Sequence, residues 1–398
     1  MERLPQEIVV DILSRLPIPS LVQSKSVCRA WRGLIRDRVL VNKHFWRMIQ
    51  NDPSFILQSY NPMQNQLYFG DFSSQNDGNV IMKKLAIPPL PKFHVVGSCN
   101  GLLCLHTSHQ SFEICIYNPF TRDYTELPKL TKHPSYNVGV QGFGFDLTTK
   151  EYKVVEISYQ IRTCGGSFPR FPRSTNYIVR APISASASIE AAVHILTLGS
   201  PTWRNLGTVP FQLMMSQQSQ VLINGKLHWV AYPNRNETKN PIISFDLATE
   251  QFQEVPRPDC ISLANRRFEQ IVALRGCLSS ASYQDDYEQL EIWVMKEYNV
   301  KESWSKEFSI GAYVPPILQQ DESFNNSRFY MNKKCMRVLC LLRSGEILLE
   351  CRNRALVLYD PHCRTFKDLH LTFEGISNYF KVVVHVASLN WINTFINT

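Results

Sequence analysis

Short units that recur along the chain constrain its fold more than any other feature of the sequence. Each unit opens with a glycine turn followed by an apolar strand; the four turns are Asn100-Gly101, Asn224-Gly225, Arg275-Gly276 and Ser344-Gly345. A second strand in the unit often ends in Asn or Asp, as in Tyr117-Asn118 and Tyr359-Asp360. Glycine supplies the positive φ that a tight hairpin turn requires. Asn or Asp can bond its own backbone and so start the next turn.

These repeats predict an all-β domain of the β-propeller type, because four-stranded units of roughly 40–50 residues are typical of propeller blades. Five units lie at residues 93–128, 139–207, 219–256, 266–308 and 335–370. Residues 54–85 supply about three further strands, and 382–389 supply one at the far end. Ring closure pairs the two ends of such a domain, since an open sheet edge invites aggregation. We therefore expect six blades closed by a C-terminal strand. Five, seven or eight blades, or a pair of β-sandwiches, remain alternatives.

The N-terminal region has a different, helical pattern. Its first apolar positions recur at helical spacing: Leu4, Ile8, Val9, Ile12, Leu13 and Leu16. Pro17 and Pro19 end this helix, and two short helices follow. The apolar stripe is wider than one packing face, and fewer than 50 residues cannot bury it alone. Either a partner or the rest of the chain must cover part of it.

The same residues resemble the F-box motif over its full length and without a gap, with the matching runs at 4–8, 12–17, 20–21 and 26–31. One departure is Ser24, where family members usually carry a small apolar residue. In that family this surface docks a Skp-type adaptor, which links to a cullin. The resemblance therefore implies the following adaptor-binding residues: Leu4, Pro5, Ile8, Ile12, Leu13, Leu16, Pro17, Leu21, Val27, Cys28 and Trp31.

The chain beyond about residue 90 resembles the plant F-box-associated interaction domain, which is kelch-like. The similar segments are 95–104, 117–119, 142–146, 152–154, 203–204 and 227–229. The double glycine of true kelch repeats is missing from every unit. Together the two resemblances imply a small all-α F-box at 1–47, a connector with first-blade strands at 48–92, and a target-recognising propeller at 93–398.

Composition narrows the class of protein. Hydrophobic residues make up 44% and charged residues 19%, which is ordinary for a globular chain. The net charge of +8 suits an acidic partner, but no basic run with interleaved aromatics points to nucleic acid. No apolar stretch approaches the ~20 residues of a membrane span, and the N-terminus lacks a signal-peptide pattern. We expect a protein of the cytoplasm, the nucleus or both.

The sequence offers no set of catalytic residues. Cys99, Cys104, His106 and His109 lack the usual spacing of a zinc site. No nucleophile elbow, phosphate loop or RING-like Cys/His array is present. We expect no metal and no cofactor, and a non-catalytic subunit that holds a target near an enzyme carried by other subunits.

The longest insertion, about 159–190, is the candidate target-binding region, because Arg and aromatic residues are enriched in binding hot spots. The predicted target-binding residues are Arg162, Phe168, Arg170, Phe171 and Arg173. An ordinary surface loop would look similar. Its positive charge favours an acidic or phosphorylated target.

With these resemblances, the sequence predicts the substrate-recognition subunit of an SCF-type (Skp–cullin–F-box) ubiquitin ligase, which recruits a target for ubiquitination and proteasomal degradation. A non-degradative binding or scaffold propeller with a protein or glycan ligand is the alternative. A propeller enzyme is a weaker third class, because no acid–base set can be named.

Overall fold

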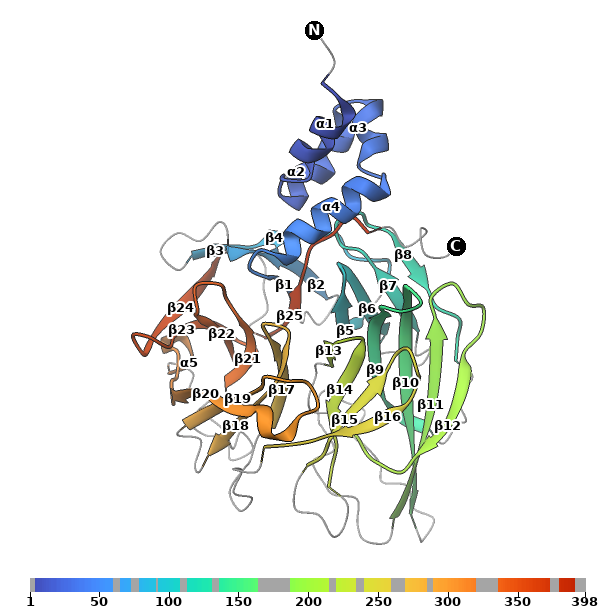
Figure 1. Cartoon of the computed structure of the whole chain (residues 1–398), viewed down its shortest axis with the longest axis vertical. Helices are drawn as coiled ribbons and strands as arrows, with labels where there is room; N and C mark the ends of the chain where they lie inside the picture. Colours follow the sequence, from blue (N-terminus) through green and yellow to red (C-terminus); the bar gives the residue numbers. More distant parts are fainter. Residues whose placement is uncertain are drawn as a thin grey trace. The chain divides into compact units, whose positions relative to one another are not determined.

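The computed structural model describes residues 4–59, 65–72, 79–90, 92–107, 113–130, 136–163, 187–214, 220–233, 240–258, 269–284, 289–319, 336–372 and 379–390. Helices come first and strands follow (Figure 1). The N-terminal helices are α1 (Gln6–Leu13), α2 (Ile18–Gln23), the 3-10 turn η1 (Ser24–Ser26), α3 (Arg29–Leu34) and α4 (Arg38–Ile49). Two short helical segments lie among the later strands, η4 (Lys301–Ser303) and α5 (Pro316–Gln319).

Each N-terminal helix begins at a residue that suits a helix start. Pro5 and Pro17 directly precede α1 and α2, where a missing backbone N–H costs nothing. The Cys28 sulfur accepts a hydrogen bond from the Trp31 backbone at 3.4 Å and caps α3. The Asp37 carboxylate accepts one from the Val39 backbone at 2.7 Å and caps α4.

The described strands form six blades, five of four strands and one of five, so the prediction of a six-bladed β-propeller is confirmed. The first blade contains β25 (Phe380–His385), β1 (Ser54–Ser59), β2 (Gln66–Gly70) and β4 (Lys83–Lys84). The second contains β5 (Phe93–Cys99), β6 (Leu102–Thr107), β7 (Ile114–Tyr117) and β8 (Tyr124–Glu126). The third contains β9 (Tyr136–Asp146), β10 (Glu151–Thr163), β11 (Ala187–Thr197) and β12 (Arg204–Val209).

The fourth blade contains β13 (Val221–Ile223), β14 (Lys226–Val230), β15 (Ile242–Asp246) and β16 (Phe252–Val255). The fifth contains β17 (Glu269–Leu274), β18 (Cys277–Gln284), β19 (Gln289–Met295) and β20 (Trp304–Gly311). The sixth contains β21 (Met336–Leu341), β22 (Ile347–Cys351), β23 (Ala355–Asp360) and β24 (Thr365–Thr372), with β3 (Asn79–Ile81) added as a fifth strand.

Strands from the two ends of the domain close the ring, as expected. β25 pairs antiparallel with β1, from Ser54 opposite His385 to Ser59 opposite Phe380. A second link between the two ends of the domain was not expected. β3, which precedes the second blade in the sequence, pairs in parallel with β24 of the sixth blade. The C-terminal strand also ends earlier than the predicted 382–389. It stops at His385, because the backbone carbonyls of Ser388 and Asn390 instead accept hydrogen bonds from the Asn118 amide at 3.1 and 2.8 Å.

The glycine turns have the geometry that the sequence predicts. Gly101, Gly225 and Gly276 have φ of 81°, 72° and 78°. The residue before each glycine also has a positive φ, between 49° and 51°. Two successive positive φ values define the type I′ hairpin turn, whose twist matches that of the strands it joins.

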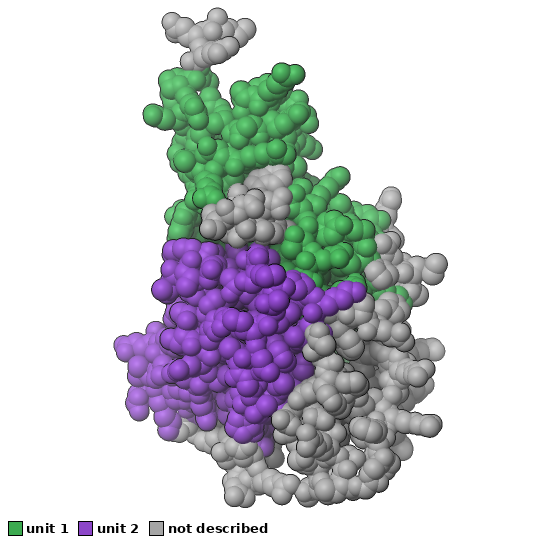
Figure 2. All heavy atoms as spheres, turned by 90° about the vertical axis from the view of Figure 1, so that its right-hand side faces the viewer, with its two compact units in different colours: residues 1–127, 281–292, 306–398 green, residues 128–280, 293–305 purple. Residues whose placement is uncertain are grey.

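The chain divides into two compact units (Figure 2). Unit 1 comprises residues 1–127, 281–292 and 306–398, and unit 2 comprises 128–280 and 293–305. One core cluster of unit 1 joins the N-terminal helices to the first two blades. A core cluster of unit 2 gathers around Val155, Trp229 and Phe245. The N-terminal helices and the strands that share their core therefore belong to a single unit.

Candidate adaptor-docking face

The apolar positions in α1 and just before it divide into two sets with opposite burial. Leu4, Ile8 and Ile12, spaced four residues apart, are 59%, 46% and 48% exposed. Val10 and Leu13 are buried. The wide apolar stripe is therefore two faces of one helix, of which only one is covered within the chain.

The covered face forms a seam between the helices and the propeller strands. We use "seam" for its buried helical residues: Val10, Leu13, Ile18, Leu21, Ile35, Leu40 and Val41. They share a core cluster with the strand residues Phe69 and Phe93 and with Leu389. Leu13 and Leu21, two of the expected adaptor-binding residues, have no exposed surface here. In this structure they belong to the core that the helices share with the strands.

The uncovered face is called the outer face, and it holds most of the predicted adaptor-binding residues. Its members are exposed: Leu4, Pro5, Ile8, Ile12, Pro17, Val27 and Cys28. Two other predicted residues, Leu16 and Trp31, are partly buried and pack against the seam. The structure thus brings the predicted residues together in one helical region but divides them between a free surface and a core.

An ion cluster fixes α1 against α4. The Asp11 carboxylate pairs with Arg15 at 2.8 Å, Lys43 at 2.7 Å and Arg47 at 2.7 Å. These three cations hold the pKa of Asp11 well below its usual value. The Ser14 hydroxyl adds to the link, since it accepts a hydrogen bond from Arg47 at 2.6 Å. These contacts fix the orientation of α1 through its polar side. They leave the outer face exposed.

A buried histidine supports the same helices. The Nε2 atom of His44 in α4 lies 3.0 Å from the backbone carbonyl of Leu16. The side chain is fully buried, and this burial lowers its pKa, so the ring is neutral at physiological pH. The neutral ring donates to the carbonyl and holds the segment after α1 on α4.

Sequence reasoning missed three exposed apolar residues on α4. Val39, Trp46 and Ile49 are 65%, 66% and 45% exposed. Their spacing of seven and three residues places them along one side of the helix, and this spacing could have identified them.

The departure from the F-box pattern at Ser24 is also explained, since its buried hydroxyl donates to the Ser20 carbonyl at 2.9 Å.

The predicted target-binding region is only partly described. Residues 160–163 and 187–190, expected in a loop, are paired parts of β10 and β11. Arg162 therefore lies on a strand, opposite Ser188. Phe168, Arg170, Phe171 and Arg173 lie outside the described residues. Their role in target binding stays a prediction.

Cys115 and Cys340 are buried free cysteines. Burial raises the pKa of Cys115 and Cys340 to about 12, so both thiols are protonated and inert. Among the described residues, no three His, Cys, Asp or Glu side chains are grouped as metal ligands. In the same part of the chain, no helix has the length and apolarity needed to cross a membrane.

Comparison with known families agrees with this architecture. Residues 1–49 match the family described as F-box-like, and residues 52–395 match the F-box associated beta propeller domain. The chain belongs to the F-box proteins with an F-box-associated β-propeller. Proteins of this class are typical SCF substrate receptors and generally act as non-catalytic adaptors, and the F-box implies binding to a Skp-type adaptor.

Similar proteins come from Arabidopsis thaliana. F-box protein At3g07870 is 40% identical over 99% of this chain and 93% of its own length. F-box/kelch-repeat protein At3g23880 is 26% identical over 88% of each chain. F-box protein CPR1 is 25% identical over 93% of this chain and 85% of its own length. A solved oligogalacturonate lyase in complex with manganese superposes with a TM-score of only 0.45 at 9% identity, over 81% of this chain and 76% of its own, which says nothing about activity.

Proposed function

We propose that this protein is the substrate-recognition subunit of an SCF-type ubiquitin ligase. The outer face binds a Skp-type adaptor and, through it, a cullin. The propeller holds a target protein for ubiquitination and proteasomal degradation. The subunit itself is non-catalytic, needs neither nucleic acid nor a membrane, and acts in the cytoplasm, the nucleus or both.

One observation carries the proposal. Ile8 and Ile12 are about half exposed, although Leu13 beside them is fully buried in the same helix. A helix that has already packed one apolar face and still presents a second is built to meet a partner, since exposed apolar patches mark interaction sites.

The experiment is co-purification of the full chain with a Skp-type adaptor and a cullin, followed by quantitative proteomics of cells that lack the protein. We expect a stable complex, and we expect at least one propeller-binding protein to accumulate and to lose its ubiquitin conjugates. A complex without any such protein would instead support the non-degradative scaffold. Failure to bind the adaptor would contradict the proposal.

A further inference from the structure

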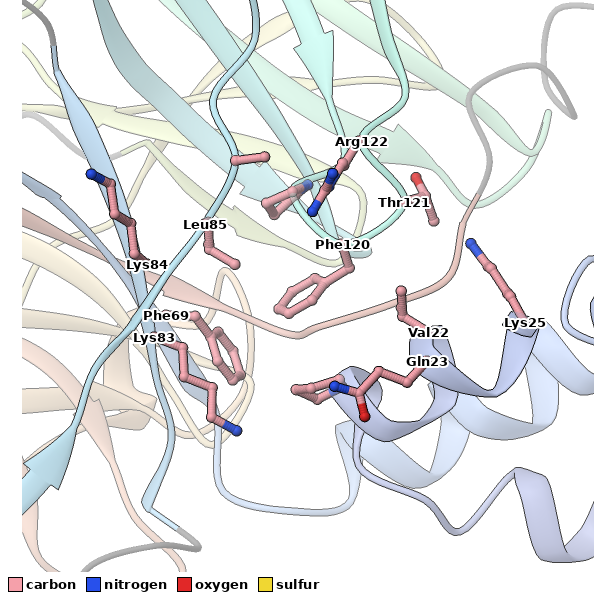
Figure 3. Close-up of a pocket in the computed structure, with 13 residues that line it drawn as sticks. Val22, Gln23, Lys25, Phe69, Lys83, Lys84, Leu85, Phe120, Thr121 and Arg122 are labelled. Atoms are coloured by element: carbon pink, nitrogen blue, oxygen red, sulfur yellow. The ribbon is translucent and has the colours of Figure 1, made fainter. Parts of the chain in front are cut away.

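A groove of about 410 Å³ lies between helix α2 and strands β2 and β4 (Figure 3). Four cationic side chains line it: Lys25, Lys83, Lys84 and Arg122. They come from η1, β4 and the turn between β7 and β8. We call it the cationic groove. All of these residues belong to unit 1.

The charge of the groove is one-sided, since no carboxylate is among its lining residues. Lys83, Lys84 and Arg122 are exposed. Within the described part of the chain these three make no ion pair. The Asp123 carboxylate, next in sequence to Arg122, interacts electrostatically with Lys25. The positive charge is therefore least balanced by carboxylates where the groove is lined by β4 and by the turn between β7 and β8.

The interior of the groove is apolar. Phe69 and Phe120 pack edge to face with ring centroids 5.0 Å apart and form its floor. Val22 and Leu85 are half-buried and stand on either side. Figure 3 shows both rings and Leu85 turned toward the space between the strands and the helix. Such a floor suits an apolar side chain flanked by acidic groups.

Protection of a sheet edge explains only part of this arrangement. β4 is the outermost strand of its blade, and lysines on an edge strand discourage aggregation. That accounts for Lys83 and Lys84. It does not account for Lys25 and Arg122, which come from a different part of the fold yet line the same groove.

We propose that the cationic groove binds an acidic peptide segment of the protein docked on the outer face. One apolar side chain of the segment lies over Phe69 and Phe120, and its carboxylates face the cations. The inference rests on the proposed function, because the partner is the same adaptor. It adds a second contact, made with the propeller and not only with the F-box helices.

The position of the groove favours the protein docked on the outer face as the source of this segment. α2 supplies Val22 and Gln23 to the wall of the groove. Two exposed residues of the outer face, Pro17 and Val27, flank α2 and η1 in the sequence. A protein seated on the outer face is therefore next to the groove. Among the described residues β4 is the edge strand of its blade, so it can also pair with an extended backbone.

The test measures adaptor binding by the full chain at several salt concentrations. The groove variant is Lys83→Glu/Lys84→Glu. The control is Lys150→Glu/Lys367→Glu, which makes the same change in charge at exposed positions outside the groove. Complementary charges act mainly on the association rate. We expect the groove variant to bind about 10-fold to 100-fold more weakly, with a slower association and a flatter salt dependence than the control.

Two outcomes separate this inference from the proposed function. No binding of the adaptor by the wild type would overturn the proposed function and the inference together. Normal binding by the wild type, with equal affinity and salt dependence in the groove variant and the control, would overturn the inference alone. A photo-crosslinking residue at position 84 should capture an acidic adaptor segment, and capture of a target protein, of another adaptor segment or of nothing would also overturn it.

Discussion

The outer face and the seam both contain apolar residues of the N-terminal helices, but the two sets differ in burial. The seam residues Leu13 and Leu21 are fully buried in a core that the helices share with propeller strands, whereas Ile8, Ile12 and Val27 are 46–65% exposed. Hydrophobicity alone therefore does not say which residues meet a partner. What separates the two sets is whether the rest of the fold covers them.

This difference implies two separable kinds of variant. Substitution in the seam should change the stability of the protein and should affect adaptor binding only through that loss. Substitution on the outer face should change binding and leave stability nearly untouched.

The largest effect on stability is expected in the seam. Leu13→Ala removes a fully buried side chain, and we expect the free energy of unfolding to fall by about 2–5 kcal/mol. Ile12→Ala, at the adjacent but half-exposed position, should change it by about 0.5 kcal/mol or less. Denaturant unfolding of both variants measures the contrast, and equal losses would abolish the distinction between the two faces.

The C-terminal segment after β25 supports the seam, and Asn118 tests it. The Asn118 amide donates to two backbone carbonyls of this segment, while the Asn118 Oδ1 accepts from the Phe120 backbone at 2.9 Å. Asn118→Asp keeps the acceptor but loses the donors, which should cost about 1–3 kcal/mol in thermal or denaturant unfolding.

The control is the reverse change at an equivalent turn. Asp360 accepts from the His362 backbone at 2.8 Å in the same way, without the link to the C-terminal segment. Asp360→Asn should therefore cost little. A loss as large as that of Asn118→Asp would show that turn chemistry, not the link, matters.

Acid should destabilise the packing of the N-terminal helices through His44. Burial lowers the pKa of this residue in the folded protein, so the unfolded state binds a proton more readily. Its contribution to stability is complete above the ordinary pKa of 6.5 and is lost as the pH falls from there. We expect the melting temperature of His44→Gln to vary less between pH 7 and pH 5 than that of the wild type, and parallel curves would contradict this role.

The smallest effect is expected for the ion cluster that joins α1 to α4. Because Asp11 is ionised at a pH well below its usual pKa of 3.8, its stabilising effect persists through neutral pH and is lost as the pH falls below that value. Asp11→Asn should lower the melting temperature slightly at low salt, and the difference should shrink at high salt. A difference that salt does not change would argue against an electrostatic role.

Much of the fold could be predicted because its signals are local. Asn100-Gly101 and the corresponding turns fix hairpins through backbone conformation alone. The parallel pairing of β3 with β24 could not be predicted, because the three residues Asn79–Ile81 carry no pattern that names a partner strand. The end of β25 at His385 likewise depends on Asn118, which lies far away in the sequence.

The candidate site could likewise be predicted only where its signals are local. Helical spacing and family resemblance located the apolar stripe, but they could not say that Leu13 is buried in the core while Ile12 is about half exposed. The cationic groove was missed because Lys25, Lys83 and Arg122 meet only after the helices pack on the first two blades.

The central claim is that the outer face docks an adaptor, and one titration tests it most directly. Isothermal titration of a Skp-type adaptor should compare the wild type with Ile8→Asp/Ile12→Asp and with Leu147→Asp/Ile317→Asp, a control in which both residues are exposed and lie outside the N-terminal helices. We predict at least about a 100-fold loss of affinity, or about 2.7 kcal/mol, for the outer-face variant only, with its melting temperature unchanged. Wild-type affinity in the outer-face variant would contradict the account.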